Sequence, residues 1–304
     1  MRCIEEVAMR RPLWCVLVIA FVVGVASTAG EVKRERSIYT RGSPPIGEPG
    51  TLLMVHIIDV GDGDAILIDT PADKKILIDG GWTWGEDEVA EPEYRAYLAE
   101  FLGAGDIDLV VISHPDYDHF VGLADIVRTH KVGQVWYTGY DSPKLSPKYW
   151  RPLLKTLREL EPRFLAPVTD SIEVGSPVVF DDGGTSGSAD DVVLTIINAP
   201  SEISETAYGS NRHLGENQRR NSSSLVVRLD YGKTSSLFTG DTNGRRKLSS
   251  DAEECDDQEL VMSRRRRRAG DPLKGKLRCT VLKVAHHGSD GSSSLPFLRA
   301  AHPA

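Results

Sequence analysis

The sequence predicts an α/β fold in which two β-sheets lie face to face inside and helices cover the outside. Apolar runs of strand length alternate with segments of helical spacing along the chain. Three of the apolar runs end directly in His or Asp residues, which indicates strands that deliver side chains to one edge of a sheet. The length of 304 residues suits one large domain or two small ones.

The first half of the chain begins with short strands and then alternates strand and helix. Tight turns join the first three strands, which predicts an antiparallel meander. A helix after them places Tyr94, Leu98 and Phe101 on one face. The expected strands are 52–58, 65–69, 75–79, 108–113 and 132–137, and the expected helices are 90–103, 120–127 and 150–160.

The second half repeats this plan with five more strands and a long polar segment. The segment 243–276 joins an acidic stretch to the run Arg264–Arg268. A solvated loop is the usual interpretation of such charge runs, and a contact with phosphate or lipid headgroups is the alternative. The expected strands are 171–180, 192–197, the hairpin 225–230 and 235–239, and 280–285.

A dense cluster of metal-ligand residue types follows the strand at 108–113. His114, Asp116, Asp118 and His119 fall within six positions, where the chain turns from a buried strand into a helix. Imidazole and carboxylate groups suit Zn, Mn or Fe, and no thiol takes part. The sequence therefore predicts a metal site on this turn.

Two later strands end in residues of the same kind. Asp241 follows the hairpin strand 235–239, and His286 follows the strand 280–285. Together with the first cluster they make six candidate ligands, which exceed one tetrahedral zinc site. The set fits two divalent ions, Zn or Mn, that share one carboxylate.

These motifs resemble those of a known family. His-Pro-Asp-Tyr-Asp-His (114–119), with Phe-Thr-Gly-Asp (238–241) and Val-Ala-His-His-Gly-Ser (284–289), resembles the metallo-β-lactamase superfamily. Within it, the run 58–68 and His-His-Gly-Ser are similar to the hydrolase domain of the competence protein ComEC. The resemblance implies a four-layer αβ/βα sandwich over residues 51–304, with metals in the cleft between the sheets. It also implies a further strand, loop and helix after Ala304, so the domain is expected to lack its C-terminal strand and helix.

The resemblance further implies a role for each candidate ligand. His114 and Asp116 would hold the first ion, and Asp118, His119 and His286 would hold the second. Asp241 would bridge the two ions. Asp118 would also act as the catalytic residue that orients a metal-activated hydroxide.

The sequence departs from the family pattern at the first ion. Many members have histidine where this chain has Asp116, and another histidine ligand before the bridging aspartate. The histidines in that interval, His130 and His213, are expected at the surface. Asn221 could replace the missing ligand with a weak oxygen contact, although a hydrogen bond within a turn is an equal alternative.

Four more residues are expected around the site. Asp79 is similar to the superfamily aspartate that hydrogen-bonds a ligand histidine, and a turn before Gly80 is its alternative role. Asp64 matches the branch motif and is expected to brace a glycine turn. His287 and Ser289 border the site, where they contact substrate or serve packing.

The N-terminus is expected to be a targeting segment. Arg10 and Arg11 precede the apolar run 13–25, and small residues follow it. Residues 1–29 thus read as a cleaved signal peptide or as an uncleaved N-terminal anchor, and residues 30–50 as a linker. Both readings export the domain, to a secreted or periplasmic location, with membrane contact only through an uncleaved segment.

The predicted activity is hydrolysis. A metal lowers the pKa of bound water from about 15.7 to about 7, which gives hydroxide at neutral pH. We expect a phosphodiesterase or nuclease-like enzyme that acts on a small-molecule phosphodiester or on nucleic acid. The formal charge of −8 means that the surface as a whole does not attract polyanions. The alternatives are hydrolysis of a lactam, lactone or thioester, and an inactive exported binding module with an incomplete site.

Overall fold

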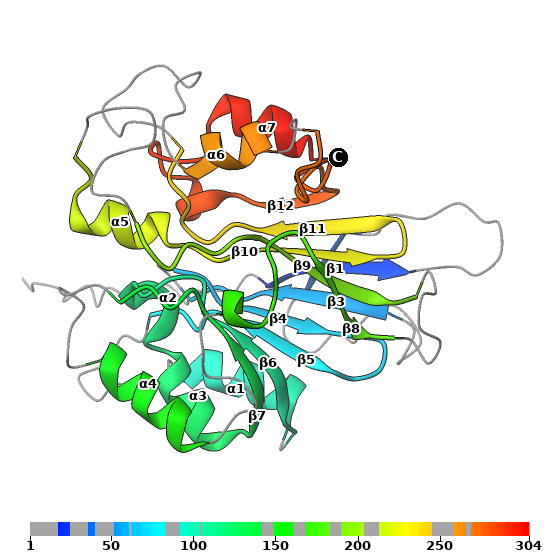
Figure 1. The fold of residues 1–304 in the computed structure, drawn as a ribbon. Coiled ribbons are helices and arrows are strands. Elements are labelled where there is room, and N and C mark those ends of the chain that lie inside the picture. The colour runs from blue at the N-terminus through cyan, green and yellow to red at the C-terminus, as the bar shows by residue number, and fades with distance from the viewer. Residues whose placement is uncertain are drawn as a thin grey trace, which may run out of the picture.

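Two β-sheets form the centre of the protein in a computed structural model, and helices lie on both outer sides (Figure 1). The predicted α/β sandwich is therefore confirmed. The structure describes residues 18–24, 36–39, 52–60, 63–82, 92–103, 105–141, 149–160, 168–182, 190–203, 213–244, 258–265 and 269–303.

The first sheet has seven strands in the order β2-β1-β3-β4-β5-β6-β7. Strands β3, β4 and β5 form the predicted antiparallel meander, and β6 and β7 continue the sheet in parallel with β5. The carboxyl ends of these three parallel strands consequently meet at one edge. The strands span Val18–Gly24 (β1), Arg36–Tyr39 (β2), Leu52–Ile57 (β3), Ile66–Asp69 (β4), Lys75–Ile78 (β5), Ile107–Val111 (β6) and Val132–Trp136 (β7).

The second sheet has five strands in the order β12-β11-β10-β9-β8. The hairpin of β10 and β11 is antiparallel, whereas β11 and β12 run parallel. Residues that follow β11 and β12 thus leave the sheet at the same edge. The strands span Pro177–Asp181 (β8), Val192–Asn198 (β9), Val226–Tyr231 (β10), Thr234–Phe238 (β11) and Val281–Lys283 (β12).

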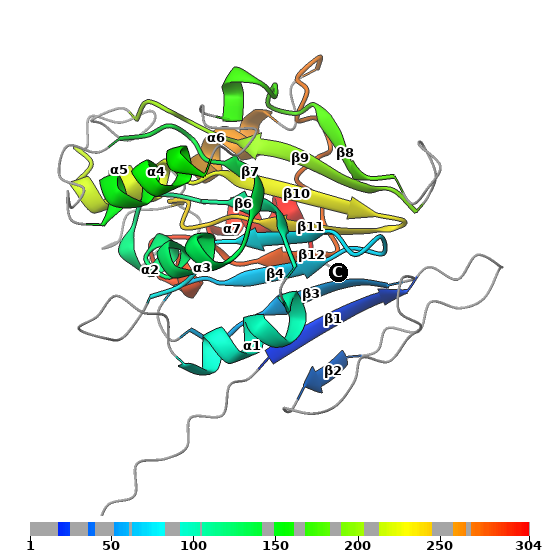
Figure 2. The same cartoon turned by 90° about the horizontal axis from the view of Figure 1, so that it is seen from below.

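The helices complete four layers. Helices α1, α3 and α4 cover the outer face of the first sheet, and α6 and α7 cover the second (Figures 1 and 2). Helices α2 and α5 lie at the edge where the strands end (Figure 1). The helices span Pro92–Leu102 (α1), Tyr117–Phe120 (α2), Leu123–Thr129 (α3), Trp150–Glu159 (α4), Glu216–Ser222 (α5), Gln258–Arg265 (α6) and Leu295–Ala301 (α7).

Alternation along the strands builds three apolar layers. In β5, the side chains of Ile76 and Ile78 face the second sheet, and Leu77 faces the helices. This period of two is what a strand buried on both faces requires. A third cluster packs Leu237 of β11 against Phe297 of α7. The two sheets are thereby fixed against each other, and their strand ends are held in register.

One expected loop is partly helical. Residues 258–265, inside the segment interpreted as a solvated loop, form α6, and the carboxylate of Glu259 is fully buried there. The loop prediction is therefore wrong for this part, because Ser293 and Ser294 donate hydrogen bonds to the Glu259 carboxylate. Residues 245–257 and 266–268 lie outside the described residues.

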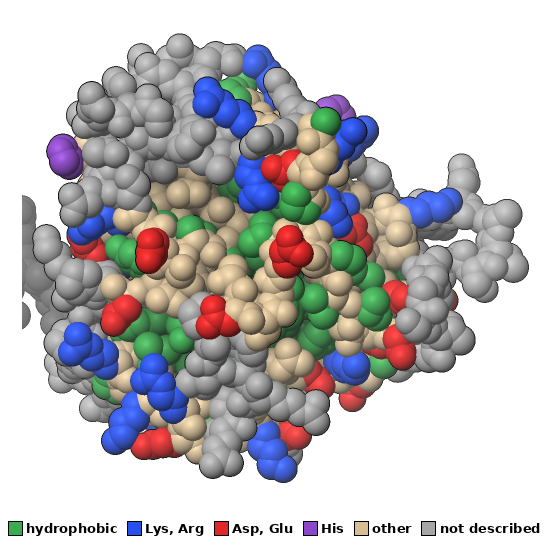
Figure 3. Space-filling model, viewed as in Figure 1, with side chains coloured by type: hydrophobic (Ala, Val, Ile, Leu, Met, Phe, Trp, Pro, Cys, Tyr) green, Lys and Arg blue, Asp and Glu red, His purple; other side chains and the backbone are tan. Residues whose placement is uncertain are grey.

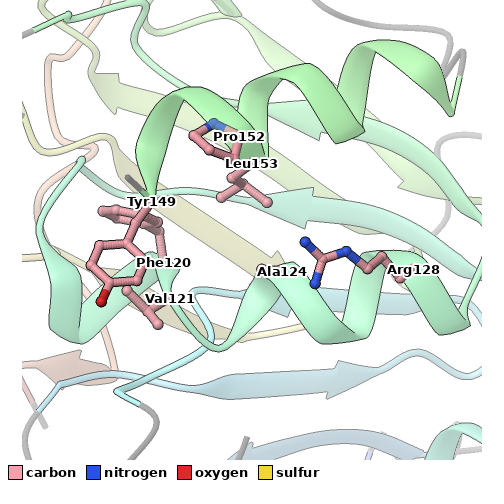
Figure 4. A pocket seen from close by; sticks show the side chains of 7 residues that line it. All are labelled: Phe120, Val121, Ala124, Arg128, Tyr149, Pro152 and Leu153. Atoms are coloured by element: carbon pink, nitrogen blue, oxygen red, sulfur yellow. The ribbon is translucent and has the colours of Figure 1, made fainter. Parts of the chain in front are cut away.

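The surface is mixed in charge, and it has a pocket between two helices. Acidic and basic side chains of the described residues are interspersed on the face in Figure 3. The pocket lies between α3 and α4, where Arg128 stands across from Tyr149 (Figure 4). Its wall is otherwise apolar and includes Phe120, Val121, Ala124, Pro152 and Leu153.

Part of the expected targeting segment lies in the first sheet. Strand β1, residues Val18–Gly24, pairs antiparallel with β3, and β2 pairs with β1. Most of the expected linker 30–50 lies outside the described residues. No described helix is long and apolar enough to cross a bilayer. The signal peptide, the anchor and the domain bounds stay predictions.

Candidate metal centre

The centre is assembled from three strand ends. The chain leaves β6 at Ser113, leaves β11 just before Asp241, and leaves β12 just before His286 and His287. A backbone hydrogen bond from Leu225 to Ser113 and another from His286 to Gly240 tie these ends together. Side chains from both sheets thus converge at one place, as the sequence predicted for His119 and Asp241.

Four donor groups lie at the spacing of a metal shell. His119 Nε2 is 3.3 Å from Asp241 Oδ1 and 3.7 Å from Asp118 Oδ2. His287 Nε2 is 3.5 Å from both Asp118 Oδ2 and Asp241 Oδ2. Ligands about 2.1 Å from a tetrahedral ion are roughly 3.4 Å apart. The nitrogen and oxygen donors therefore fit one divalent cation.

Unpartnered buried atoms also indicate a cation. Among the described residues, His119 Nε2, His114 Nε2 and Asp241 Oδ1 are buried without a hydrogen-bond partner. Such atoms are costly to bury, because they lose hydrogen bonds to water and make none with the protein. A bound cation would satisfy them, so the residues present fit a metal.

The other nitrogen of His119 is held by a carboxylate. Asp79 Oδ2 is 2.9 Å from His119 Nδ1, and it also accepts a 2.6 Å hydrogen bond from Ser113 Oγ. Asp79 Oδ1 accepts from the Ser113 backbone N–H at 2.8 Å. This arrangement keeps the proton on Nδ1 and leaves Nε2 as the donor to a metal. Asp79 therefore lies where the sequence analysis put it.

The carboxylates of the cluster lie close together, and the imidazoles beside them balance their negative charge. Burial disfavours the charged form of Asp241, yet the imidazoles of His119 and His287 hold its pKa well below the ordinary value. Burial likewise opposes a charge on His287, but contacts with Asp118, Asp241 and Asp64 raise its pKa to about 11. A divalent ion would supply the same compensation and would replace the protons.

The two adjacent histidines have an uncommon backbone. His286 and His287 have φ angles of 52° and 50°, in the left-handed region. Residues other than glycine adopt it at a cost, and such strain gathers at functional sites. The conformation aims both rings at Asp241, with His286 Nε2 3.8 Å from Oδ2. His287 joins the cluster of Asp118, His119 and Asp241, a place that the sequence analysis gave to His286.

The remaining predicted residues lie around this cluster. His114 Nε2 is 3.9 Å from Asp241 Oδ2, and burial lowers the pKa of His114 to about 3, so its ring is neutral. Asn221 Nδ2 is 3.4 Å from both ring nitrogens of His286. Ser289 donates its backbone N–H to the carbonyl of His286 and thereby closes that turn. Asp116 contacts Arg220 instead of the other donors.

Three charged residues lie at the centre but were not predicted as parts of it from the sequence. Lys283 Nζ pairs with Asp64, donates to the carbonyl of Gly240 at 3.0 Å, and is 3.7 Å from Asp241 Oδ1. Asp64 was expected to brace a turn, but its carboxylate lies 3.5 Å from His287 Nδ1. Arg220 comes from α5. Lys283 is the last residue of β12 and lies three positions before His286, and this position was the available clue.

Comparison with known proteins identifies the family. The model of the metallo-beta-lactamase superfamily matches residues 58–302. "ComE operon protein 3" of Bacillus subtilis is 25% identical over 263 residues, which are 82% of this chain and 27% of that protein. The chain thus spans about a quarter of the relative it matches. The match agrees with the branch that the motifs indicated.

The chain is also similar, at low identity, to solved structures. An archaeal metallo-beta-lactamase superfamily protein from Sulfolobus tokodaii has a TM-score of 0.40 and 16% identity, covering 82% of this chain and 84% of that one. MEM-A1, a subclass B3 metallo-beta-lactamase from a soil metagenome, has a TM-score of 0.37 and 15% identity, covering 82% and 88%. Because the family model spans nearly all of the described domain, this chain belongs to the metallo-beta-lactamase superfamily.

Proposed function

We propose that this chain is an exported, metal-dependent phosphodiesterase that acts on a small-molecule phosphodiester or on nucleic acid. The observation that carries the proposal is the set of four nitrogen and oxygen donors, 3.3–3.7 Å apart, at the strand ends. Superfamily membership supports metal-dependent hydrolysis in general. A divalent ion held by these four donors, with a further coordination position open to water, would lower the pKa of that water and stabilise negative charge on the reacting oxygens.

Asp118 is the residue best placed to handle the attacking water. Its side chain is 25% exposed, whereas that of Asp241 is 3% exposed. Contacts with His287 and His119 outweigh the effect of burial and lower the pKa of Asp118, so it is ionised at neutral pH. Its carboxylate can therefore orient a water molecule that enters from solvent.

Positive side chains favour a phosphate-containing substrate. Lys283 and Arg220 both reach the edge of the centre, and the Arg220 Nη1 group donates to no described residue. Guanidinium groups bind phosphoryl groups well, because the planar guanidinium presents two parallel N–H donors that two phosphoryl oxygens can accept. The similarity to "ComE operon protein 3" supports the ComEC-like branch of the superfamily.

The test compares two substrate classes on one protein. Bis-p-nitrophenyl phosphate and single-stranded DNA are assayed beside nitrocefin, with Mn²⁺ or Zn²⁺ added. We expect turnover of the phosphodiesters, and its loss in Asp241→Asn but not in the exposed Asp106→Asn control. Turnover of nitrocefin alone would establish the lactam alternative, and no turnover of any substrate would favour a binding module.

Export is a separate part of the proposal. The apolar segment 13–25, after Arg10 and Arg11, supports it. Expression of the full chain in a bacterium with a secretion pathway, followed by fractionation and mass measurement, tests it. Cleavage near Ala29 identifies a signal peptide, and an intact chain in the membrane fraction identifies an anchor. An intact chain that stays in the cytoplasm contradicts both.

A further inference from the structure

Asp116, which the sequence analysis assigned to the first metal ion, is occupied by an arginine. Arg220 Nε is 3.3 Å from Asp116 Oδ2, and Arg220 Nη2 is 3.4 Å from Oδ1. The Asp116 Oδ1 atom also accepts the backbone N–H of Tyr117 at 3.0 Å and so caps α2. Both carboxylate oxygens therefore have partners.

The ion pair is sheltered from water. The side chains of Arg220 and Asp116 are 11% and 19% exposed. Separation of a pair in such surroundings would leave a poorly solvated charge on each side. Arg220 is further held by Asn217 Oδ1, at 3.0 Å on the same helix. A cation would have to displace this guanidinium to reach Asp116.

His114, which was expected to hold the first ion, and His286, which was expected to hold the second, both lie beside Asp241 but outside the cluster of four donors. His114 Nε2 and His286 Nε2 are 3.9 Å and 3.8 Å from Asp241 Oδ2, so they could contribute to a second site if Asp116 were free to complete it. Within the described part of the chain, two groups of donor atoms lie within 4.8 Å of one another, and neither includes His114, Asp116 or His286. The two groups are Asp118, His119, Asp241 and His287, and Asp64, Asp79 and His119, of which the first brings together the larger number of donors.

We propose that the centre holds one tightly bound divalent ion, on Asp118, His119, Asp241 and His287, and that Arg220 excludes a second ion by occupying Asp116. The inference deepens the proposed function and rests on it for the nature of the centre. It replaces the two ions expected from the sequence by one ion and a fixed guanidinium. The guanidinium of Arg220 then takes the place of the second ion as a positive charge beside the substrate.

Metal stoichiometry tests this inference without an activity assay. The full chain is stripped with EDTA and titrated with MnCl₂ and with ZnCl₂ by calorimetry, and bound metal is counted by mass spectrometry after gel filtration. We expect one ion per chain in the wild type and a loss of affinity of at least tenfold in His287→Ala. Arg220→Ala should free Asp116 and raise the count to two.

Matched variants distinguish removal of the arginine from general damage. Arg220→Lys keeps a cation beside Asp116 and should keep one ion. Arg219→Ala removes a neighbouring ion pair on α5, with Glu216, and should also keep one ion. If Arg220→Ala fails to fold, as judged by circular dichroism, Arg220→Met replaces it, since its side chain preserves most of the buried volume.

The outcomes separate this inference from the proposed function. Two ions in the wild type, no ion in the wild type, or one ion in both the wild type and the folded Arg220→Ala or Arg220→Met variant would each overturn the inference. Phosphodiester turnover with two ions would leave the proposed function standing. One ion in the wild type and two in the variant, without any turnover, would support the inference and contradict the function.

Discussion

The carboxylate of Asp79 lies 2.9 Å from Nδ1 of His119, on the side of the ring away from the metal-facing nitrogen. The backbone of Asp79 has a φ of 58°, which lets the chain turn sharply out of β5 and bring the carboxylate beneath the site. One residue thus connects the end of β5 to the ligand that follows β6. The orientation of His119 depends on this contact.

Asp79→Asn is expected to weaken metal binding by about 10–100-fold, because the amide holds the His119 proton less firmly. Asparagine tolerates the left-handed backbone at this position. A chelator competition titration with Zn²⁺ measures the affinity, and the exposed Asp106→Asn is the control. Equal affinities in the two variants would show that Asp79 has no influence on the ligand.

Gly122→Ala is expected to destabilise the fold by about 3 kcal/mol, since overpacking against rigid backbone forces the chain apart. A Cβ atom at Gly122 would lie 1.9 Å from the carbonyl oxygen of Gly80. Gly215→Ala is the matched control, because its Cβ would meet only Gln218 Oε1, at 3.7 Å. Urea denaturation of both variants provides the comparison, and similar midpoints would contradict the prediction.

Glu259→Gln is expected to cost about 2–3 kcal/mol of stability, because a buried charged acceptor is replaced by a group that carries its own donors. Glu259 accepts from Ser293 N at 2.6 Å and from Ser294 N at 2.7 Å, and its own N–H donates to Asn243 at 3.1 Å. It thereby ties the turn after Asp241 to the turn after His287.

Thermal and chemical denaturation of Glu259→Gln measure this cost, with the exposed Glu202→Gln as control. Metal affinity should fall in the first variant as well, since both ligand turns lose an anchor. An unchanged melting temperature in Glu259→Gln would show that the carboxylate contributes nothing to the fold.

His56 makes the fold sensitive to mild acid. Burial, with a smaller effect of Lys75, lowers the pKa of His56 to about 4, while its ring contacts the Tyr97 hydroxyl at 2.6 Å. In the unfolded chain the pKa is about 6.5, so between these values the unfolded state binds more protons and stability falls as the pH falls.

Between pH 7.5 and pH 5 the expected loss from His56 is about 2 kcal/mol. His56→Leu should remove this part of the pH dependence, even though the variant is less stable at pH 7.5. The exposed His302→Asn serves as control and should keep the wild-type profile. Denaturation at a series of pH values tests the difference, and parallel profiles for all three proteins would refute it.

The sequence allowed much of the framework to be predicted because its features are local. The strand expected at 75–79 and the helix expected at 90–103 are observed as Lys75–Ile78 and Pro92–Leu102. The apolar spacing of these two segments and the turns beside them are sufficient to predict both elements. His119 and Asp241 follow strands of different sheets, so their convergence was predicted from the combined motifs and the family resemblance and not from a local pattern.

The details of the centre depend on features that no local pattern encodes. The order of His286 and His287 around Asp241 is set by two consecutive left-handed residues. Arg220 reaches Asp116 across 104 positions of sequence, so only the tertiary fold reveals the pair. The burial of Glu259 inside a charged run likewise arises from helix packing that the composition of the run conceals.

His286 and His287 have left-handed backbones, so substitutions there that raise thermal stability are expected to lower activity. A side chain in that backbone region costs about 1–2 kcal/mol per residue, and glycine avoids the cost. A laboratory evolution campaign that screens only for survival after heating should therefore enrich glycine at position 286 or 287. The resulting proteins would resist heat better and yet lose a ring that faces Asp241, so a campaign of this kind needs an activity screen at every round.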